Sequence, residues 1–143
     1  MPYSELLLIP MRQDLTRFGV AEARTTDAVD EMLSPASGTV LMVVNSVCGC
    51  AAGKARPAIG MALTAETKPD KVATVFAGGD VEATQHLREK YLGQFPPSSP
   101  SMAIFRDGKP VYYMHRRQIE SRNAPEIAAE LKAAFAQFCG VQG

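Results

Sequence analysis

The sequence predicts an α/β fold in which a central mixed β-sheet carries helices on both faces, organised as one domain over residues 1–143. Five successive apolar residues at positions 40–44, three of them valine, are typical of a strand buried on both faces. Strand-like and helix-like segments alternate after it, and Asp107-Gly108 separates two further strand-like segments as a hairpin turn. A chain of 143 residues can bury the core of one domain, and no long linker divides it.

Two helices are expected before the first strand. Apolar residues recur at helical spacing up to a natural stop at Gly19: Leu8, Met11, Leu15 and Phe18. Because proline is tolerated in the first turn of a helix, we expect Pro10 near the start of this one. A second, short helix is expected after Thr26, with Asp27 in its first turn.

The middle of the chain predicts a helix, a strand and another helix. Residues 51–63 are rich in alanine and favour a helix. Residues 72–77 have the composition of a second buried strand. Asp80 follows two glycines, so we expect it to cap a helix that closes near Gly93.

The last third of the chain predicts a hairpin and a final helix. Residues 94–101 are rich in proline and serine and favour irregular structure. Strands are expected at 102–105 and 110–114, the second at the edge of the sheet because it begins with a proline. Asn123 and Glu126 have the spacing of a capping box for a helix with an apolar stripe: Ile127, Leu131, Phe135 and Phe138.

Composition limits the classes of function. The formal net charge is zero, so neither a nucleic-acid surface nor a basic membrane-binding patch is expected. The apolar run at residues 6–9 is too short for a signal peptide or a membrane span. We therefore expect a cytoplasmic protein, in which thiols are kept reduced. In that setting three cysteines, two of them one residue apart, indicate redox chemistry or metal binding.

The segment Cys48-Gly49-Cys50 lies where the buried strand gives way to a helix. A helix N-terminus stabilises a thiolate through its free N–H groups and its dipole. Two cysteines at this spacing can reach the Cα separation of a disulfide, roughly 4.4–6.8 Å, since Gly49 has no Cβ. The small ring predicts a strained bond that forms only transiently. We expect Cys48 to be the nucleophile, since it is the better exposed, and Cys50 to be the resolving thiol.

Two other interpretations remain open. The cysteines could be small buried residues without chemistry, or Cys48, Cys50 and Cys139 could bind a soft metal such as Zn²⁺ or Cu(I). A metal site needs further ligands, and His86 and His115 stand at no recognised spacing. We therefore expect no metal site, and we expect Cys139 to be an inert thiol at the end of the last helix.

Several motifs carry a resemblance to a known family. They are residues 45–53 around the cysteine pair and residues 55–57, supported in the same order by residues 10–12, 75–78 and 98–103. The sequence resembles the bacilliredoxin family of thioredoxin-like proteins. The resemblance implies a thioredoxin-like three-layer α/β/α fold with a central mixed sheet, here with an extra N-terminal helix. It also implies an enzyme that removes bacillithiol, a low-molecular-weight thiol, from mixed disulfides on oxidised client proteins, or a general disulfide isomerase or reductase.

The resemblance assigns roles to individual residues. It implies that Cys48 attacks the mixed disulfide and that Cys50, or a free thiol, regenerates it. Pro100 resembles the cis-proline that faces the cysteines in such folds, and Ser99 would present its backbone to the substrate. Arg116 belongs to a basic cluster that could hold an anionic thiol, although a solvated strand end is the simpler reading. No cofactor is expected beyond the small thiol, which acts as co-substrate.

Two further points concern the cysteine helix. Lys54 and Arg56 would lower the pKa of Cys48 if they turned toward it. The spacing departs from that of thioredoxins, which place two residues between their cysteines, and the chain contains no tryptophan.

Client proteins and the small thiol are the expected partners, and the sequence leaves the oligomeric state open.

Overall fold

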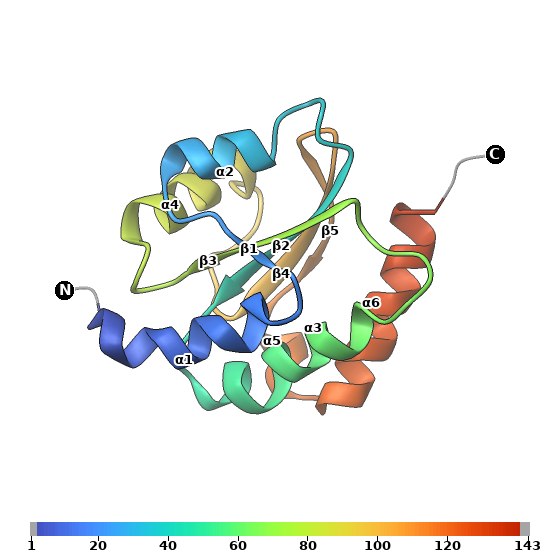
Figure 1. The fold of residues 1–143 in the computed structure, drawn as a ribbon. Coiled ribbons are helices and arrows are strands. Elements are labelled where there is room, and N and C mark those ends of the chain that lie inside the picture. The colour runs from blue at the N-terminus through green and yellow to red at the C-terminus, as the bar shows by residue number, and fades with distance from the viewer. Residues whose placement is uncertain (1–2, 141–143) are drawn as a thin grey trace.

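The computed structural model describes residues 3–140 and contains a five-stranded mixed sheet with helices on both faces (Figure 1). The strand order is β1-β3-β2-β4-β5, with β1, β3 and β2 parallel and with β4 and β5 antiparallel to their neighbours. The strands are β1 (Ala21–Glu22), β2 (Thr39–Asn45), β3 (Lys71–Phe76), β4 (Ser101–Arg106) and β5 (Lys109–Met114).

The helices form the two outer layers. They are α1 (Glu5–Thr16), α2 (Thr26–Met32), the π-helical turn η1 (Ala51–Ala55), α3 (Arg56–Ala62), α4 (Val81–His86), the π-helical turn η2 (Leu87–Tyr91), α5 (Arg116–Glu120) and α6 (Ala124–Phe138). Helices α1, α3, α5 and α6 pack on one face of the sheet, and α2 with α4 and η2 packs on the other. Within the described residues, no helix is long and apolar enough to cross a membrane.

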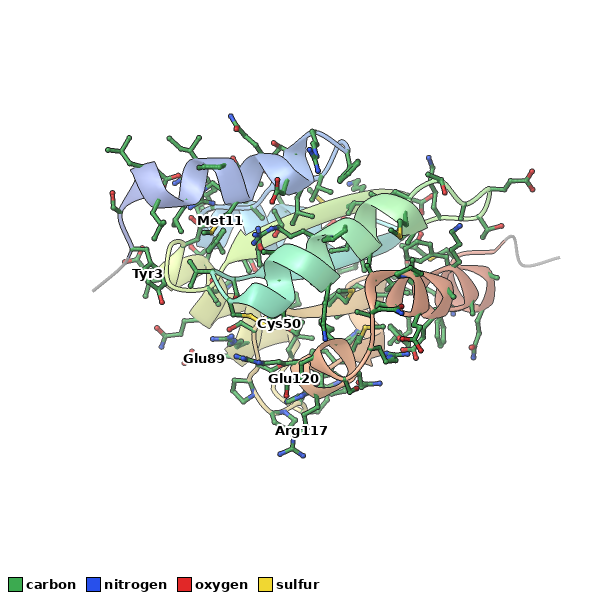
Figure 2. The ribbon with its side chains drawn as sticks, turned by 90° about the horizontal axis from the view of Figure 1, so that it is seen from below. Tyr3, Met11, Cys50, Glu89, Arg117 and Glu120 are labelled. Atoms are coloured by element: carbon green, nitrogen blue, oxygen red, sulfur yellow. A yellow bond between two sulfur atoms is a disulfide. The ribbon has the colours of Figure 1, made fainter. Side chains whose placement is uncertain are left out.

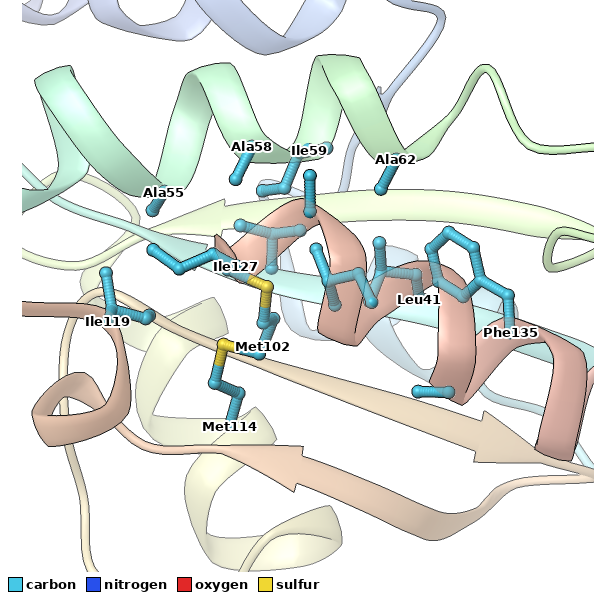
Figure 3. Packing of buried hydrophobic residues seen from close by; sticks show 14 of the residues in the cluster. Leu41, Ala55, Ala58, Ile59, Ala62, Met102, Met114, Ile119, Ile127 and Phe135 are labelled. Atoms are coloured by element: carbon cyan, nitrogen blue, oxygen red, sulfur yellow. The ribbon is translucent and has the colours of Figure 1, made fainter. Parts of the chain in front are cut away.

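The central strand β2 has the two buried faces that its apolar run predicts. Leu41 and Val43 belong to the core beneath α3 and α6, which Figure 3 shows. Val40, Met42 and Val44 belong to the second core, beneath α2 and α4. Each of these five side chains is at most 1% exposed. Because successive residues of a strand point to opposite faces, a continuous apolar run is what a strand between two helical layers requires.

The N-terminal part differs from expectation in three details. Helix α1 begins at Glu5, so Pro10 lies inside the helix and not near its first turn. Proline removes the hydrogen bond to the carbonyl four residues earlier, and that carbonyl belongs to Leu6, which is 83% exposed and accessible to water. Helix α2 starts at Thr26, with the Thr25 hydroxyl accepting from the N–H of Ala28. Strand β1 was not expected, since two residues show no periodicity.

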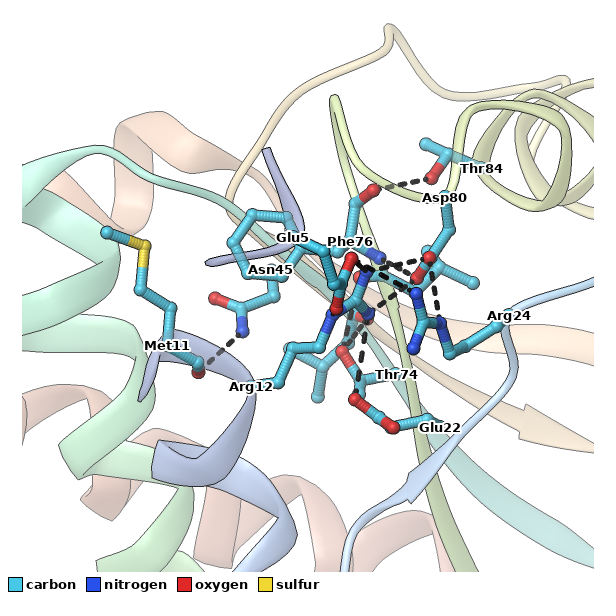
Figure 4. A network of polar contacts seen from close by, with 12 residues as sticks. Glu5, Met11, Arg12, Glu22, Arg24, Asn45, Thr74, Phe76, Asp80 and Thr84 are labelled. Atoms are coloured by element: carbon cyan, nitrogen blue, oxygen red, sulfur yellow. Dashed lines mark hydrogen bonds and ion pairs between the residues drawn. The ribbon is translucent and has the colours of Figure 1, made fainter. Parts of the chain in front are cut away.

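Asp80 stands at the expected N-cap position of α4, but its side chain makes no capping bond there. Its carboxylate accepts from the N–H of Phe76 at 3.0 Å and from both terminal nitrogens of Arg12 at 2.8 and 3.0 Å (Figure 4). Glu5 and Arg24 complete this network. Helix α1 is therefore anchored to the loop that follows β3 by a buried ion pair.

The helix that follows the cysteines is continuous but not uniformly α-helical. It opens with the π-helical turn η1 and continues as α3, with Pro57 in the first turn of α3. Pro57 has no N–H to offer the carbonyl of Gly53, which favours a locally wider turn at this point.

The C-terminal part follows the sequence pattern. Asp107 and Gly108 both have positive φ, 51° and 84°, as the tightest hairpin turns require. Strand β5 lies at the edge of the sheet, where Pro110 is tolerated. The capping box of α6 is present, with both Asn123–Glu126 hydrogen bonds formed. Helix α5 was not expected, because five residues are too few for a periodic signal.

Candidate active site

The cysteine pair lies at the C-terminal end of the central strand. Strand β2 ends at Asn45, and three residues later Cys48 stands where the helical segment begins. The carbonyl of Cys48 accepts from the N–H of Ala51 at 3.0 Å and of Ala52 at 3.2 Å. These bonds place Cys48 at the positive end of the helix dipole, as the strand-to-helix transition predicts. Figure 2 looks onto this end of the molecule, with Cys50 near its centre between α1 and α5.

Cys48 and Cys50 form a disulfide with a Cα–Cα distance of 5.4 Å. The distance lies inside the range that was expected for this spacing. Both cysteines are half-buried, and Cys50 packs against the core beneath α3 and α6. Gly49 between them is exposed, and apart from its chain neighbours no atom lies within 4 Å of the place where a Cβ would stand. The surface above the disulfide is therefore free of side chain at Gly49.

The buried side chain of Arg56, which is 4% exposed, makes hydrogen bonds with the loop before Cys48. Nη1 of Arg56 donates to the carbonyl of Ser46 at 2.8 Å and to Oδ1 of Asn45 at 3.0 Å, and Nε donates to Asp14 at 3.0 Å. Burial lowers the pKa of the Arg56 guanidinium, and Asp14 offsets part of that effect. The hydroxyl of Ser46 in turn accepts from the N–H of Cys48 at 3.1 Å. Arg56 thus fixes the backbone that delivers Cys48.

Asn45 connects the same loop to helix α1. Its Oδ1 also accepts from the N–H of Ser46 at 2.8 Å, and its Nδ2 donates to the carbonyl of Met11 at 3.2 Å. Sequence reasoning missed both Asn45 and Asp14 as parts of the site. A polar residue that ends an otherwise apolar strand, and an arginine within an alanine-rich helix, were the available signals.

Lys54 and Arg56 were expected to lower the pKa of Cys48 only if they turned toward it, and their hydrogen bonds lead elsewhere. Nζ of Lys54 donates to the carbonyl of Glu120 at 2.5 Å, which directs it to α5. Arg56 is directed to Asp14 and to the strand end, as described above.

The proline loop lies at the same end of the sheet. The Ser99–Pro100 peptide is cis. Ser101 pairs with Val44 in the antiparallel register of β2 and β4, so Pro100 stands beside the end of β2 that leads to Cys48. The cis isomer is the one expected for Pro100.

Two arginines hold successive carbonyls of this loop. Nη1 of Arg116 donates to the carbonyl of Ser99 at 3.3 Å, and its backbone N–H donates to the hydroxyl of Ser98 at 3.3 Å. Nη2 of Arg88 donates to the carbonyl of Ser98 at 3.1 Å. Sequence reasoning singled out Arg116 but missed Arg88, because α4 and η2 meet the loop only in the folded chain. The arginines make the surroundings of the loop cationic.

Among residues 3–140, no hydrogen bond connects His86, His115 or Cys139 to the disulfide. Nδ1 of His115 accepts from the N–H of Arg117, so His115 caps α5. Nε2 of His86 lies 2.8 Å from Oδ1 of Asp30, and the His86 side chain is 26% exposed. Cys139 is half-buried at the end of α6, and burial raises its pKa. Within residues 3–140, no group of three or more histidine, cysteine or acidic side chains could hold a metal ion.

Comparison with known proteins gives a consistent family. A family model described as "Disulphide isomerase" matches residues 3–139. A bacilliredoxin of Salinibacter ruber is 54% identical over 142 residues, covering 98% of this chain and 83% of the relative. A bacilliredoxin of Koribacter versatilis is 51% identical over 138 residues, covering 96% and 94%. The structure also resembles the crystal structure of a Malassezia sympodialis thioredoxin, with a TM-score of 0.55 and 18% sequence identity. The match covers 84% of this chain and 90% of the thioredoxin chain. The chain therefore belongs to the bacilliredoxin family, and with its thioredoxin fold it is a thiol-disulfide oxidoreductase.

Proposed function

We propose that this protein removes a low-molecular-weight thiol, bacillithiol or a similar anionic thiol, from mixed disulfides on client proteins in the cytoplasm. The observation that carries the proposal is the Cys48–Cys50 disulfide at the junction of β2 and its helix, beside the cis Ser99–Pro100 peptide. The relatives named bacilliredoxin support the choice of thiol.

In the first step the thiolate of Cys48 attacks the sulfur of the small thiol in the adduct. The S–S bond to the client breaks, the client cysteine leaves as a thiolate and takes up a proton, and a new S–S bond joins the small thiol to Cys48. The helix N-terminus favours the attacking thiolate, because its free N–H groups and dipole stabilise negative charge. The lack of a side chain at Gly49 leaves room for the adduct above the sulfur.

In the second step the thiolate of Cys50 attacks the sulfur of Cys48. The small thiol leaves as a thiolate, and the Cys48–Cys50 disulfide forms, which is the state of the pair in this structure. Two electrons from an external thiol reductant then restore the dithiol. Alternatively, a second molecule of the small thiol attacks the adduct on Cys48 directly, which releases the small-thiol disulfide.

Ser99 and Arg116 are the proposed substrate contacts. The backbone of Ser99 would pair with an extended segment of the client, in the manner of a neighbouring strand. Arg116 would contribute positive charge for a carboxylate of the thiol, at the cost of its present bonds to the Ser99 carbonyl and to Glu120.

The Cys50→Ser variant tests the proposal. It is mixed with a client that carries a bacillithiol mixed disulfide, and the intact masses of both proteins are followed. We expect the adduct mass to leave the client and to appear on Cys48, where the variant cannot resolve it. Retention of the adduct on the client, with the variant folded and its Cys48 reduced, would refute the proposal. The matched Cys139→Ser variant should behave as the wild-type chain does.

A general disulfide isomerase or reductase is the second candidate, and the description of the matching family model favours it. The same experiment separates the two. In an isomerase, Cys48 attacks the cysteine of the client itself, so the Cys50→Ser variant would become covalently joined to the client and the small thiol would be released.

A further inference from the structure

Arg88 lines a cavity of about 390 Å³ next to the proline loop. The other lining residues come from the loop after β3, from α4 and η2, and from the proline-rich segment: Gly78, Val81, Thr84, Gln85, Glu89 and Pro97. The volume lies within the range of pockets that bind small molecules, roughly 300–1,000 Å³.

The cavity lies between two segments that lead to the candidate active site. On one side Gly78 follows Ala77, whose N–H donates to the carbonyl of Asn45 at the end of β2 at 3.0 Å. On the other side Pro97 shortly precedes the cis Ser99–Pro100 peptide. A ligand in the cavity would thus lie beside the strand end that carries Cys48 and beside the proline loop.

Arg88 brings an unbalanced positive charge into this cavity. It is half-buried, and among residues 3–140 no carboxylate lies within 4.0 Å of it. By contrast, the more buried Arg12 and Arg56 both have acidic partners. Burial lowers the pKa of the Arg88 guanidinium, which nevertheless stays charged. Glu89 also lines the cavity, but it is exposed and accepts from Gln85 at 2.9 Å.

The guanidinium of Arg88 has donors left for a ligand. Among the described residues its one hydrogen bond runs from Nη2 to the carbonyl of Ser98 at 3.1 Å. This bond fixes the orientation of the guanidinium, and a planar guanidinium presents its remaining N–H groups in a fixed fork that matches a carboxylate. A partly desolvated cation of this kind is stabilised by an anion, because the pairing offsets the loss of its hydration.

We propose that Arg88 binds a carboxylate of the small thiol during its transfer to Cys48. This inference rests on the proposed function and names the residue that recognises the thiol. The thiol would lie across the proline loop, with Arg88 on one side and Arg116, bonded to the neighbouring carbonyl of Ser99, on the other. An acidic side chain of the client could supply the same chemistry, and the experiment separates the two sources.

The test compares small-thiol adducts of different charge. One client cysteine is loaded with mercaptosuccinate, 2-mercaptoethanol or cysteamine, and transfer to Cys48 is timed by intact mass in the Cys50→Ser background. We expect the dianionic adduct to transfer about fivefold faster than the neutral one, the size of one partly exposed charge-assisted contact. Arg88→Gln should remove most of this preference, leaving the part that Arg116 supplies, and should slow the neutral adduct much less than the dianionic one, while Arg88→Lys should keep more of the preference.

The control variant is Arg17→Gln, which removes an exposed arginine whose guanidinium lies over the ring of Phe18, 5.0 Å from its centroid. It should keep the full preference. An equal loss for all three adducts in Arg88→Gln would mean that Arg88 only supports the loop, and it would overturn the proposal. So would a preference that survives Arg88→Gln undiminished.

Client recognition is tested with clients that carry Glu or Gln beside the loaded cysteine. If Arg88→Gln removes discrimination between these clients but not between the thiols, the carboxylate belongs to the client and the proposal is wrong. Failure of the folded Cys50→Ser protein to accept any adduct would refute the proposed function itself, and the role of Arg88 would fall with it. Charge-blind transfer by the unsubstituted site would refute only the role of Arg88.

Discussion

Replacing Arg56 by methionine should weaken both the fold and the reactivity of Cys48. The substitution leaves the carbonyl of Ser46 without its charged donor, in a residue that is 6% exposed. An orphaned buried group costs about 1–3 kcal/mol. Oδ1 of Asn45 keeps the N–H of Ser46, and Asp14, with a side chain 39% exposed, can be hydrated again. Methionine retains much of the apolar contact and avoids the desolvation of a charge. We therefore expect a net loss of about 2–3 kcal/mol in the free energy of unfolding.

Urea denaturation of the reduced protein measures this loss, which should lower the midpoint by about 1 M or more. The second readout is the pH dependence of alkylation of Cys48. Its midpoint should move to higher pH, because the helix start that stabilises the thiolate is less firmly held without Arg56. Arg17→Met removes an exposed arginine and should stay within about 0.5 kcal/mol of the wild type. If Arg56→Met matched that control in both stability and alkylation, the hydrogen bonds of Arg56 would contribute nothing measurable to the free energy of unfolding or to the reactivity of Cys48. That result would refute the prediction.

Three further substitutions test other parts of the molecule. Asp80→Asn should cost about 1–3 kcal/mol in urea denaturation, since it removes the buried carboxylate that pairs with Arg12 and leaves Glu5 as its remaining close acidic partner; a loss below about 0.5 kcal/mol would contradict this. The hydrogen bond from Arg122 is the main cause that lowers the pKa of Glu130, so Glu130 stabilises the fold above its unfolded pKa near 4.5, and this contribution is lost as the pH falls through the folded value. Glu130→Gln should therefore flatten the acid limb of a stability-against-pH profile, and an unchanged limb would exclude this role. Cys139 should be alkylated slowly, because burial raises its pKa, and Cys139→Ser should keep most transfer activity; total loss would make Cys139 part of the chemistry.

Local patterns predicted most of the fold. The apolar run of β2, the Asp107-Gly108 turn and the Asn123–Glu126 capping box each depend on neighbours in sequence, and each is present in the structure. Elements of two to five residues, such as β1 and α5, escaped because periodicity needs a longer window.

Side-chain destinations were harder to predict than elements. Asp80 occupies its cap position, but the 68-residue separation between it and Arg12 hides the ion pair that redirects its carboxylate. Arg56 was placed on the correct helix, yet its partner Asp14 lies 42 residues away along the chain. The cysteine pair could be identified because the motif consists of three consecutive residues. The residues that hold the pair in place are distant in the sequence and become neighbours only in the folded chain.

These long-range contacts explain how the N-terminal helix contributes to the site. Within a single turn of α1, the Met11 carbonyl accepts from Asn45, Arg12 pairs with Asp80, and Asp14 pairs with Arg56. The three partners lie at the end of β2, after β3 and at the start of α3, so α1 connects the segments that surround the disulfide. Two of the three contacts involve buried charges, which would be costly without their partners. A helix that contributes no redox-active residue therefore helps to hold the backbone that delivers Cys48.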